Sequence, residues 1–151
     1  MPSQHSAGFW GLEGGGVFLC VTMLAGQTMA LIDYDLTVSW GLQEPASLVT
    51  AVGVALNKGF GAADTVVYLP LLIGGLAGLW FRKAWAVIAM AAALGITAYW
   101  PVVSLYTLYA AIGAPGFTFA NHTAYTLILV PIIVYGLWGL TVLYRHRDWL
   151  H

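Results

Sequence analysis

Charged residues are scarce in this chain. Asp, Glu, Lys and Arg make up only 7% of its 151 residues, whereas 60% are hydrophobic. A soluble domain carries about 25% charged residues, so the composition fits a chain dissolved in lipid. The chain has only five Lys and Arg residues and a net charge of −1. It therefore has no basic stripe that would hold a phosphate backbone. The sequence therefore argues against nucleic acid as a partner.

Cysteine and the common catalytic motifs are almost absent as well. Cys20 is the only cysteine, so the chain offers no disulfide and no cysteine metal cluster. We find no glycine-rich phosphate loop, no H-E-x-x-H, no G-x-S-x-G and no pair of transmembrane histidines for haem. The sequence predicts no cofactor. The N-terminal residues lack a basic start and a small-residue cleavage site, so we expect the first apolar run to be retained.

Long apolar runs are what the chain does contain. A helix needs about 20 apolar residues to cross a bilayer. Four runs meet this length, at about residues 12–32, 60–81, 84–112 and 123–144. They predict an all-α integral membrane protein, with residues 1–151 forming a single domain. We expect the four transmembrane helices to be arranged as two helical hairpins in series.

A shorter apolar segment, at about residues 46–57, lies between the first two runs. It is too short to cross alone. We interpret it as an interfacial or re-entrant helix over the outer surface. The alternative is the first part of a broken helix that continues into the second span, with Gly59 and Gly61 as the break.

The positions of the cations predict the orientation. Lys and Arg near the ends of spans are retained on the cytoplasmic side. Arg82, Lys83, Arg145 and Arg147 would all lie on one side of the membrane, and only Lys58 on the other. The sequence therefore predicts a multi-pass protein with cytoplasmic N- and C-termini.

Spans two and four resemble each other. Alignment of Pro70 with Pro131 superposes PLLIGGLAGL on PIIVYGLWGL. A parallel internal repeat would explain this match. Shared packing chemistry explains it equally, because glycines such as Gly74 and Gly78 let helix backbones approach closely. These two glycines also offer a face for a homo-oligomer or for a partner in a membrane complex.

The polar residues gather in the outer halves of the predicted spans. Such groups are costly in a bilayer and usually face the bundle interior, a water-filled cavity or the headgroups. The sequence therefore predicts an outward-facing cleft between the hairpins. The outer polar groups are Gln27, Thr28, Asp33, Asp35, Asp64, Tyr68, Tyr99, Ser104, Tyr106, Thr107, Tyr109, Asn121, His122, Tyr125 and Thr126.

Asp64 is the leading functional candidate within this cleft. A buried carboxylate should have a partner, and Lys58 and His122 are the outer side chains able to carry positive charge. The same residues could instead form a structural pair at the headgroups. The predicted ligand-binding residues are Lys58, Asp64, Tyr68, Tyr99, Trp100, Tyr106, Asn121, His122 and Tyr125. The aromatic members could equally form an interface belt.

Three functions fit this sequence. The leading one is a membrane-embedded binding protein that holds a lipophilic or amphiphilic small molecule, or membrane lipid, in the outer cleft. The second is an intramembrane isomerase or hydratase in which Asp64 and His122 act as acid and base. The third is an accessory subunit of a membrane complex. Asp33 and Asp35 form a weak candidate for a metal site, but a solvated helix stop explains them as well.

Overall fold

The structure is a computed structural model that describes residues 6–145. Within these residues the secondary structure is entirely helical. Seven α-helices and two π-helical turns, η1 and η2, follow one another along the chain. Their bounds are α1 Ala7–Met23, η1 Leu24–Thr28, α2 Met29–Ile32, α3 Tyr34–Ser39, α4 Ala46–Ala63, η2 Asp64–Tyr68, α5 Leu69–Trp80, α6 Ala86–Ala110 and α7 His122–Arg145.

Four of the resulting helical stretches are long and apolar enough to cross a membrane, as the sequence predicts. They cover Ala7–Ile32, Ala46–Trp80, Ala86–Ala110 and His122–Arg145. The first stretch begins five residues earlier than expected, because the Ser6 side chain caps α1 by accepting a hydrogen bond from the Phe9 backbone N–H at 3.2 Å. The predicted all-helical architecture is thereby confirmed for the described residues, and the four long apolar helices indicate a multi-pass membrane protein.

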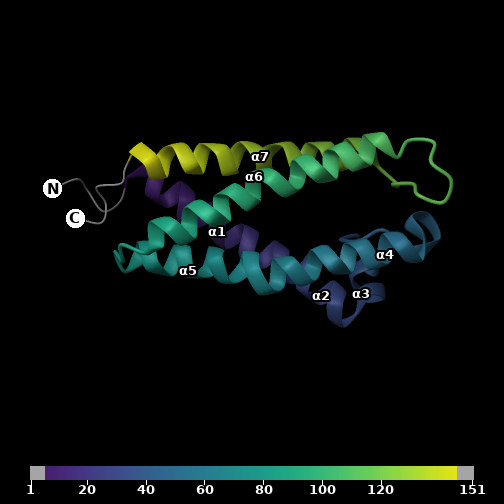
Figure 1. Cartoon of the computed structure of the whole chain (residues 1–151), viewed down its shortest axis with the longest axis horizontal. Helices are drawn as coiled ribbons and strands as arrows, with labels where there is room; N and C mark the ends of the chain where they lie inside the picture. Colours follow the sequence, from purple (N-terminus) through teal and green to yellow (C-terminus); the bar gives the residue numbers. More distant parts are fainter. Residues whose placement is uncertain (1–5, 146–151) are drawn as a thin grey trace.

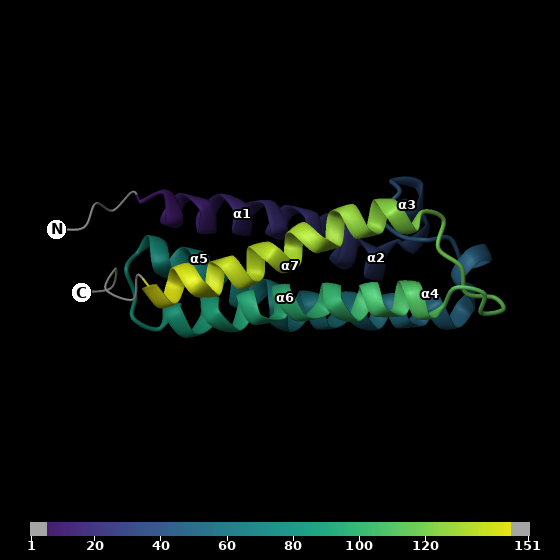
Figure 2. The ribbon, with the colours of Figure 1, turned by 90° about the horizontal axis from the view of Figure 1, so that it is seen from above.

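The long helices lie along one axis in both perpendicular views (Figures 1 and 2). The start of α1, the end of α7 and the turn at residues 81–85 share one end of the molecule, which we call the termini end. The opposite end holds α3, the start of α4 and the loop at residues 111–121, and we call it the loop end. Arg147, which contributes to the predicted orientation, and both chain termini lie outside the described residues.

The separate helix expected at residues 46–57 is not confirmed. This segment is the first part of α4, which runs through η2 into α5 as one candidate span of 35 residues. The helix is interrupted at Thr50 and changes to π-helical winding at η2, and it is regular at Gly59 and Gly61. Thr50 has φ 63° and ψ 176°, a conformation that glycine adopts far more readily than a β-branched residue.

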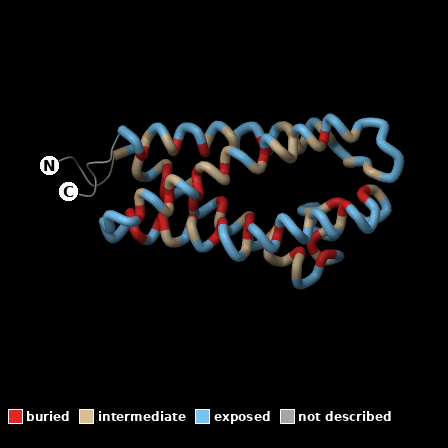
Figure 3. Tube along the Cα trace, in the orientation of Figure 1, coloured by how far each residue is buried: buried red, intermediate tan, exposed pale blue. Residues whose placement is uncertain are grey.

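The core lies where α1, α5, α6 and α7 meet (Figure 3). Glycines make these contacts close: a Cβ added at Gly75 would lie 2.9 Å from the Met90 Cα, and one at Gly136 would lie 2.8 Å from the Ala98 backbone nitrogen. Glycine-mediated packing is therefore present on both sides of α6. The predicted pair of hairpins is not confirmed, since α6 packs closely against both α5 and α7.

The predicted repeat is not confirmed either. Pro70 is the second residue of α5, just after the π-helical turn η2, whereas Pro131 lies within the uninterrupted helix α7. Gly78 is buried against Trp85 and Ala86 of the same chain, so this part of the proposed docking face is already covered.

The two π-helical turns lie against each other. Thr28 of η1 and Thr65 of η2 share a hydrogen bond of 2.9 Å between their hydroxyl oxygens. Gly61, one turn before η2, permits this approach, because a Cβ at this position would lie 2.7 Å from the Gln27 carbonyl oxygen. Single π-helical turns inside α-helices are frequent at functional sites. Each of these two turns contributes a polar side chain to the pocket described next.

Candidate functional site

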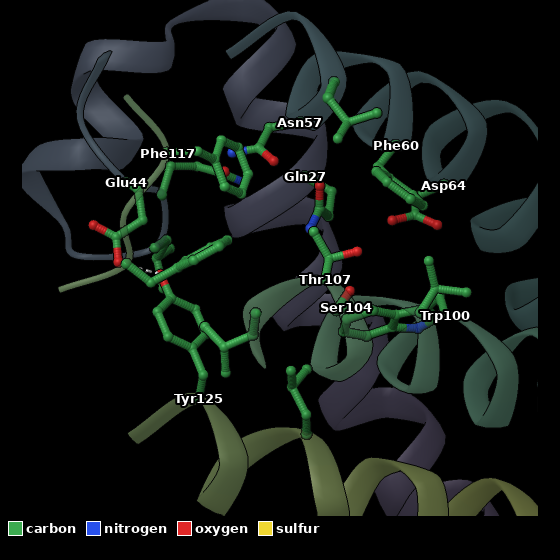
Figure 4. A pocket seen from close by; sticks show the side chains of 17 residues that line it. Gln27, Glu44, Asn57, Phe60, Asp64, Trp100, Ser104, Thr107, Phe117 and Tyr125 are labelled. Atoms are coloured by element: carbon green, nitrogen blue, oxygen red, sulfur yellow. Dashed lines mark hydrogen bonds between the residues drawn. The ribbon is translucent and has the colours of Figure 1, made fainter. Parts of the chain in front are cut away.

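A pocket lies between the α4–η2 helix on one side and α6 and α7 on the other, in the half of the molecule toward the loop end (Figure 4). Its cavity volume is about 150 Å³. Apolar and aromatic side chains make up most of the wall, together with a few polar groups. The residues that line it are Gln27, Leu42, Gln43, Glu44, Leu56, Asn57, Phe60, Asp64, Trp100, Val103, Ser104, Thr107, Leu108, Phe117, Phe119, Tyr125 and Leu129.

Asp64 is the first residue of η2, and its side chain reaches the pocket wall. The residue is only 7% exposed. Among residues 6–145, its carboxylate has no hydrogen bond or ion pair. A buried carboxylate without a partner is energetically costly. The Asp64 carboxylate is therefore the charged group of the pocket wall with the fewest hydrogen-bond partners.

Two further polar groups in the wall are buried without a partner in the described part of the chain. These are the Gln27 side-chain oxygen, contributed by η1, and the Trp100 indole nitrogen, contributed by α6. The first is a hydrogen-bond acceptor and the second a donor. Together with Asp64 they leave the pocket with two acceptor groups and one donor that the protein itself does not satisfy.

Glu44 has a different role at the other end of the pocket. It is 6% exposed, and its Oε1 accepts hydrogen bonds from the Tyr125 hydroxyl and the Ala120 backbone N–H, each at 3.0 Å. The Glu44 carbonyl oxygen accepts from the Tyr34 hydroxyl at 2.9 Å, and Tyr34 in turn accepts from the Asn57 amide at 3.1 Å. We call these contacts the Glu44 network. They join the loop before α4 to α3, α4, α7 and the loop after α6.

The loop at residues 111–121 joins α6 to α7 at the loop end (Figure 1), and its Phe117 and Phe119 line the pocket. The Thr118 backbone N–H donates to the Leu48 carbonyl oxygen at 2.9 Å. Phe117 packs on Gly53, where a Cβ would lie 2.9 Å from its ring. The interruption of α4 at Thr50 lies between these two contacts in sequence.

Burial is the largest cause that raises the pKa of the Tyr34 hydroxyl, which lies in α3 outside the four long helices. The Asn57 hydrogen bond acts in the opposite direction, and the nearby Glu44 carboxylate adds to the increase. Tyr34 therefore stays protonated at neutral pH and can donate its proton to the Glu44 carbonyl oxygen.

Three of the predicted ligand-binding residues line the pocket, namely Asp64, Trp100 and Tyr125. Tyr68 is fully buried outside the pocket lining, and its hydroxyl shares a hydrogen bond of 2.7 Å with the Thr97 hydroxyl. Tyr99 and Tyr106 are 69% and 77% exposed on the outside of α6. Both lie outside the pocket lining.

The two predicted cationic partners of Asp64 also lie elsewhere. The Lys58 ammonium lies 5.8 Å from the centroid of the Tyr34 ring. The His122 ring lies beside Tyr109 and Phe119, outside the pocket lining. The acid–base enzyme would require Asp64 and His122 to face one common space. Asp64 lines the pocket, whereas His122 lies outside its lining.

Asn121 and the two aspartates of the weak metal site have structural contacts. Asn121 caps α7, since its Oδ1 accepts from the Ala124 backbone N–H at 2.9 Å. Asp33 caps α3 in the same way, through the Leu36 backbone N–H at 2.9 Å. Asp35 is exposed in the first turn of α3. Within residues 6–145, no three His, Cys, Asp or Glu side chains are grouped to hold a metal ion.

Sequence reasoning missed several residues of the wall. Asn57, Phe60 and Asp64 follow the spacing of one helical face, and so do Trp100, Ser104 and Thr107. This periodicity would have identified both helical walls. No local pattern could have added the loop residues, which reach the pocket only through the tertiary fold. They are Leu42, Gln43, Glu44, Phe117 and Phe119.

Comparison of the chain with protein-family models, with curated proteins and with solved structures found no match. Any assignment of function therefore depends on the pocket itself.

Proposed function

We propose that this protein is a membrane-embedded binding protein whose pocket holds a small amphiphilic molecule. The observation that carries the proposal is that Asp64, Gln27 and Trp100, each with a polar group that has no partner among the described residues, all line one cavity. A buried polar group without a hydrogen bond is destabilising. A ligand that supplies the missing partners would remove this cost, and the apolar wall would enclose its body.

The size of the pocket limits the ligand. A cavity of roughly 150 Å³ holds a molecule of about the size of benzene. The pocket therefore takes either a small metabolite or the polar end of a longer molecule whose tail extends into lipid. Phe60, Phe117 and Phe119 offer aromatic surface for the apolar part.

The cations support an outward-facing pocket. Arg82, Lys83 and Arg145 belong to the termini end, whereas Lys58 belongs to the half that holds the pocket. Retention of Lys and Arg on the cytoplasmic side would place the chain termini there. The loop end, with the first turns of α4, would then lie at the outer surface.

Native mass spectrometry of protein purified in mild detergent tests the proposal. Ser104→Phe fills the pocket from α6, and Val102→Phe places the same ring on the exposed side of the same helix. We expect a small molecule that stays bound to the wild type and to Val102→Phe and that is lost from Ser104→Phe. If all three proteins carry the same bulk lipids and nothing else, the proposal is wrong.

A further inference from the structure

The charge of the pocket indicates which class of molecule it accepts. We propose that the occupant is a small organic cation whose ammonium group binds the Asp64 carboxylate. This inference rests on the proposed binding function and specifies the ligand. The argument uses the charge balance of the wall, the state of its two carboxylates and the chemistry of the side chains around Asp64.

The described residues that line the pocket include two carboxylates, Asp64 and Glu44, and no Lys, Arg or His. The wall is therefore net negative. Opposite charge would have to come from outside the wall. Within residues 6–145, Lys58 faces the Tyr34 ring and His122 packs beside Tyr109, which leaves a ligand as the source of positive charge. An anionic ligand would face two carboxylates at close range and is disfavoured.

The two carboxylates are not equivalent. Glu44 already accepts hydrogen bonds from Tyr125 and Ala120, so part of its capacity is used within the protein. Asp64 accepts none from the described residues. Figure 4 shows the two at opposite ends of the pocket, with Asp64 at the same end as Trp100 and Phe60. The free negative charge is therefore concentrated at the end that Asp64 and Trp100 form.

The groups near Asp64 match an ammonium group. The Gln27 oxygen is an unsatisfied acceptor, and an ammonium carries several N–H donors for this oxygen and for the carboxylate. The rings of Trp100 and Phe60 line the same end of the pocket, and aromatic faces attract cations. The Trp100 N–H would meet an oxygen on the same ligand, such as a hydroxyl or an ether.

A divalent metal ion fits this environment poorly. Ca²⁺ takes about six to eight oxygen ligands, and Mg²⁺ takes an octahedron of them. Asp64 has aromatic neighbours at its end of the pocket, and residues 6–145 contain no cluster of metal-ligating side chains. A carboxylate among aromatic rings is instead typical of sites for organic ammonium ligands.

Binding of two matched probes tests the inference. Isoamylammonium and isoamyl alcohol have the same carbon skeleton and differ in the charge of the polar end. Tritiated forms of both are measured by scintillation proximity on protein in nanodiscs, at neutral pH and in sodium-free buffer. The variants are Asp64→Asn, which removes the charge at nearly constant shape, and Glu13→Gln as the control. Glu13 is 8% exposed and has an unpartnered carboxylate oxygen, but it lies outside the pocket lining.

We expect the ammonium probe to bind the wild type and Glu13→Gln equally well, and Asp64→Asn at least about tenfold more weakly. Binding of the alcohol should be the same in all three proteins, which also shows that the pocket of Asp64→Asn is intact. Ammonium binding that is insensitive to Asp64→Asn would overturn the inference, as would wild-type protein that prefers the alcohol. In both cases the binding pocket itself stands. If neither probe binds and Ser104→Phe loses no co-purified molecule, the proposed function fails as well.

Discussion

Replacing Tyr125 with phenylalanine should loosen the loop end of the molecule. The substitution removes only the hydroxyl that donates to Glu44 Oε1 at 3.0 Å. Glu44 is buried, and hydrogen bonds to charged groups contribute about 1.5–3 kcal/mol. We therefore expect Tyr125→Phe to lower the free energy of unfolding by about 1.5–3 kcal/mol.

Glu44→Ala should be more damaging than Tyr125→Phe. It leaves two donors without an acceptor, the Tyr125 hydroxyl and the Ala120 backbone N–H. Each unsatisfied donor costs about 1–3 kcal/mol, so the expected loss is roughly 2–6 kcal/mol. In the Glu44→Ala background, Tyr125→Phe should cost little, because its partner is already gone. The double-mutant cycle should then give a coupling energy of about 1.5–3 kcal/mol.

Titration of the protein from mild-detergent micelles into dodecyl sulfate, followed by tryptophan fluorescence, measures these free energies. Tyr109→Phe is the matched control, since Tyr109 shares an exposed hydrogen bond of 2.8 Å with neutral Thr126 near the same end. Its loss should stay below about 1 kcal/mol. The reasoning is refuted if Tyr125→Phe costs no more than Tyr109→Phe, or if the coupling energy lies within about 0.5 kcal/mol of zero.

Three further predictions concern the backbone, the helix contacts and pH. Thr50→Gly should stabilise the protein by up to about 1–2 kcal/mol in the same titration, because φ 63° is strained for threonine. The Thr50 side chain is exposed, so its removal should cost little packing. A loss of stability would contradict this prediction. Gly136→Ala should cost about 1–3 kcal/mol, because its Cβ would lie 2.8 Å from the Ala98 nitrogen, whereas Gly14→Ala, with open space around it, should cost nothing; equal effects would argue against close α6–α7 packing. Burial raises the pKa of Tyr34, so the folded state keeps the hydroxyl proton to a higher pH than the unfolded state does. The contribution of this group to stability is therefore complete below the ordinary pKa of about 10, and it is lost as the pH rises through the raised pKa of the folded state. Unfolding free energies across this alkaline range should fall for the wild type and stay flatter for Tyr34→Phe, and parallel curves would disprove it.

The amino-acid sequence determined the number of long helices and most of their boundaries. The length of an apolar run and the residues that end a helix are local properties of the sequence. In a bilayer, an α-helix is the main structure in which one segment satisfies its own backbone hydrogen bonds. The predicted spans at 84–112 and 123–144 therefore agree with α6 and α7 to within two residues at each end. The choice of Asp64, Trp100 and Tyr125 also followed from the sequence, because polar groups in a span tend to face the interior.

The tertiary structure decided which polar residues share a space. Tyr99 and Trp100 are neighbours in sequence, but a helix turns by about 100° per residue, so one is 69% exposed while the other lines the pocket. Glu44 and Tyr125 are 81 residues apart, and only the folded chain brings them together. The direction of a side chain depends on the rotation of each helix about its axis. That rotation is set by contacts between distant segments, such as Gly61 with Gln27, and no local pattern encodes it.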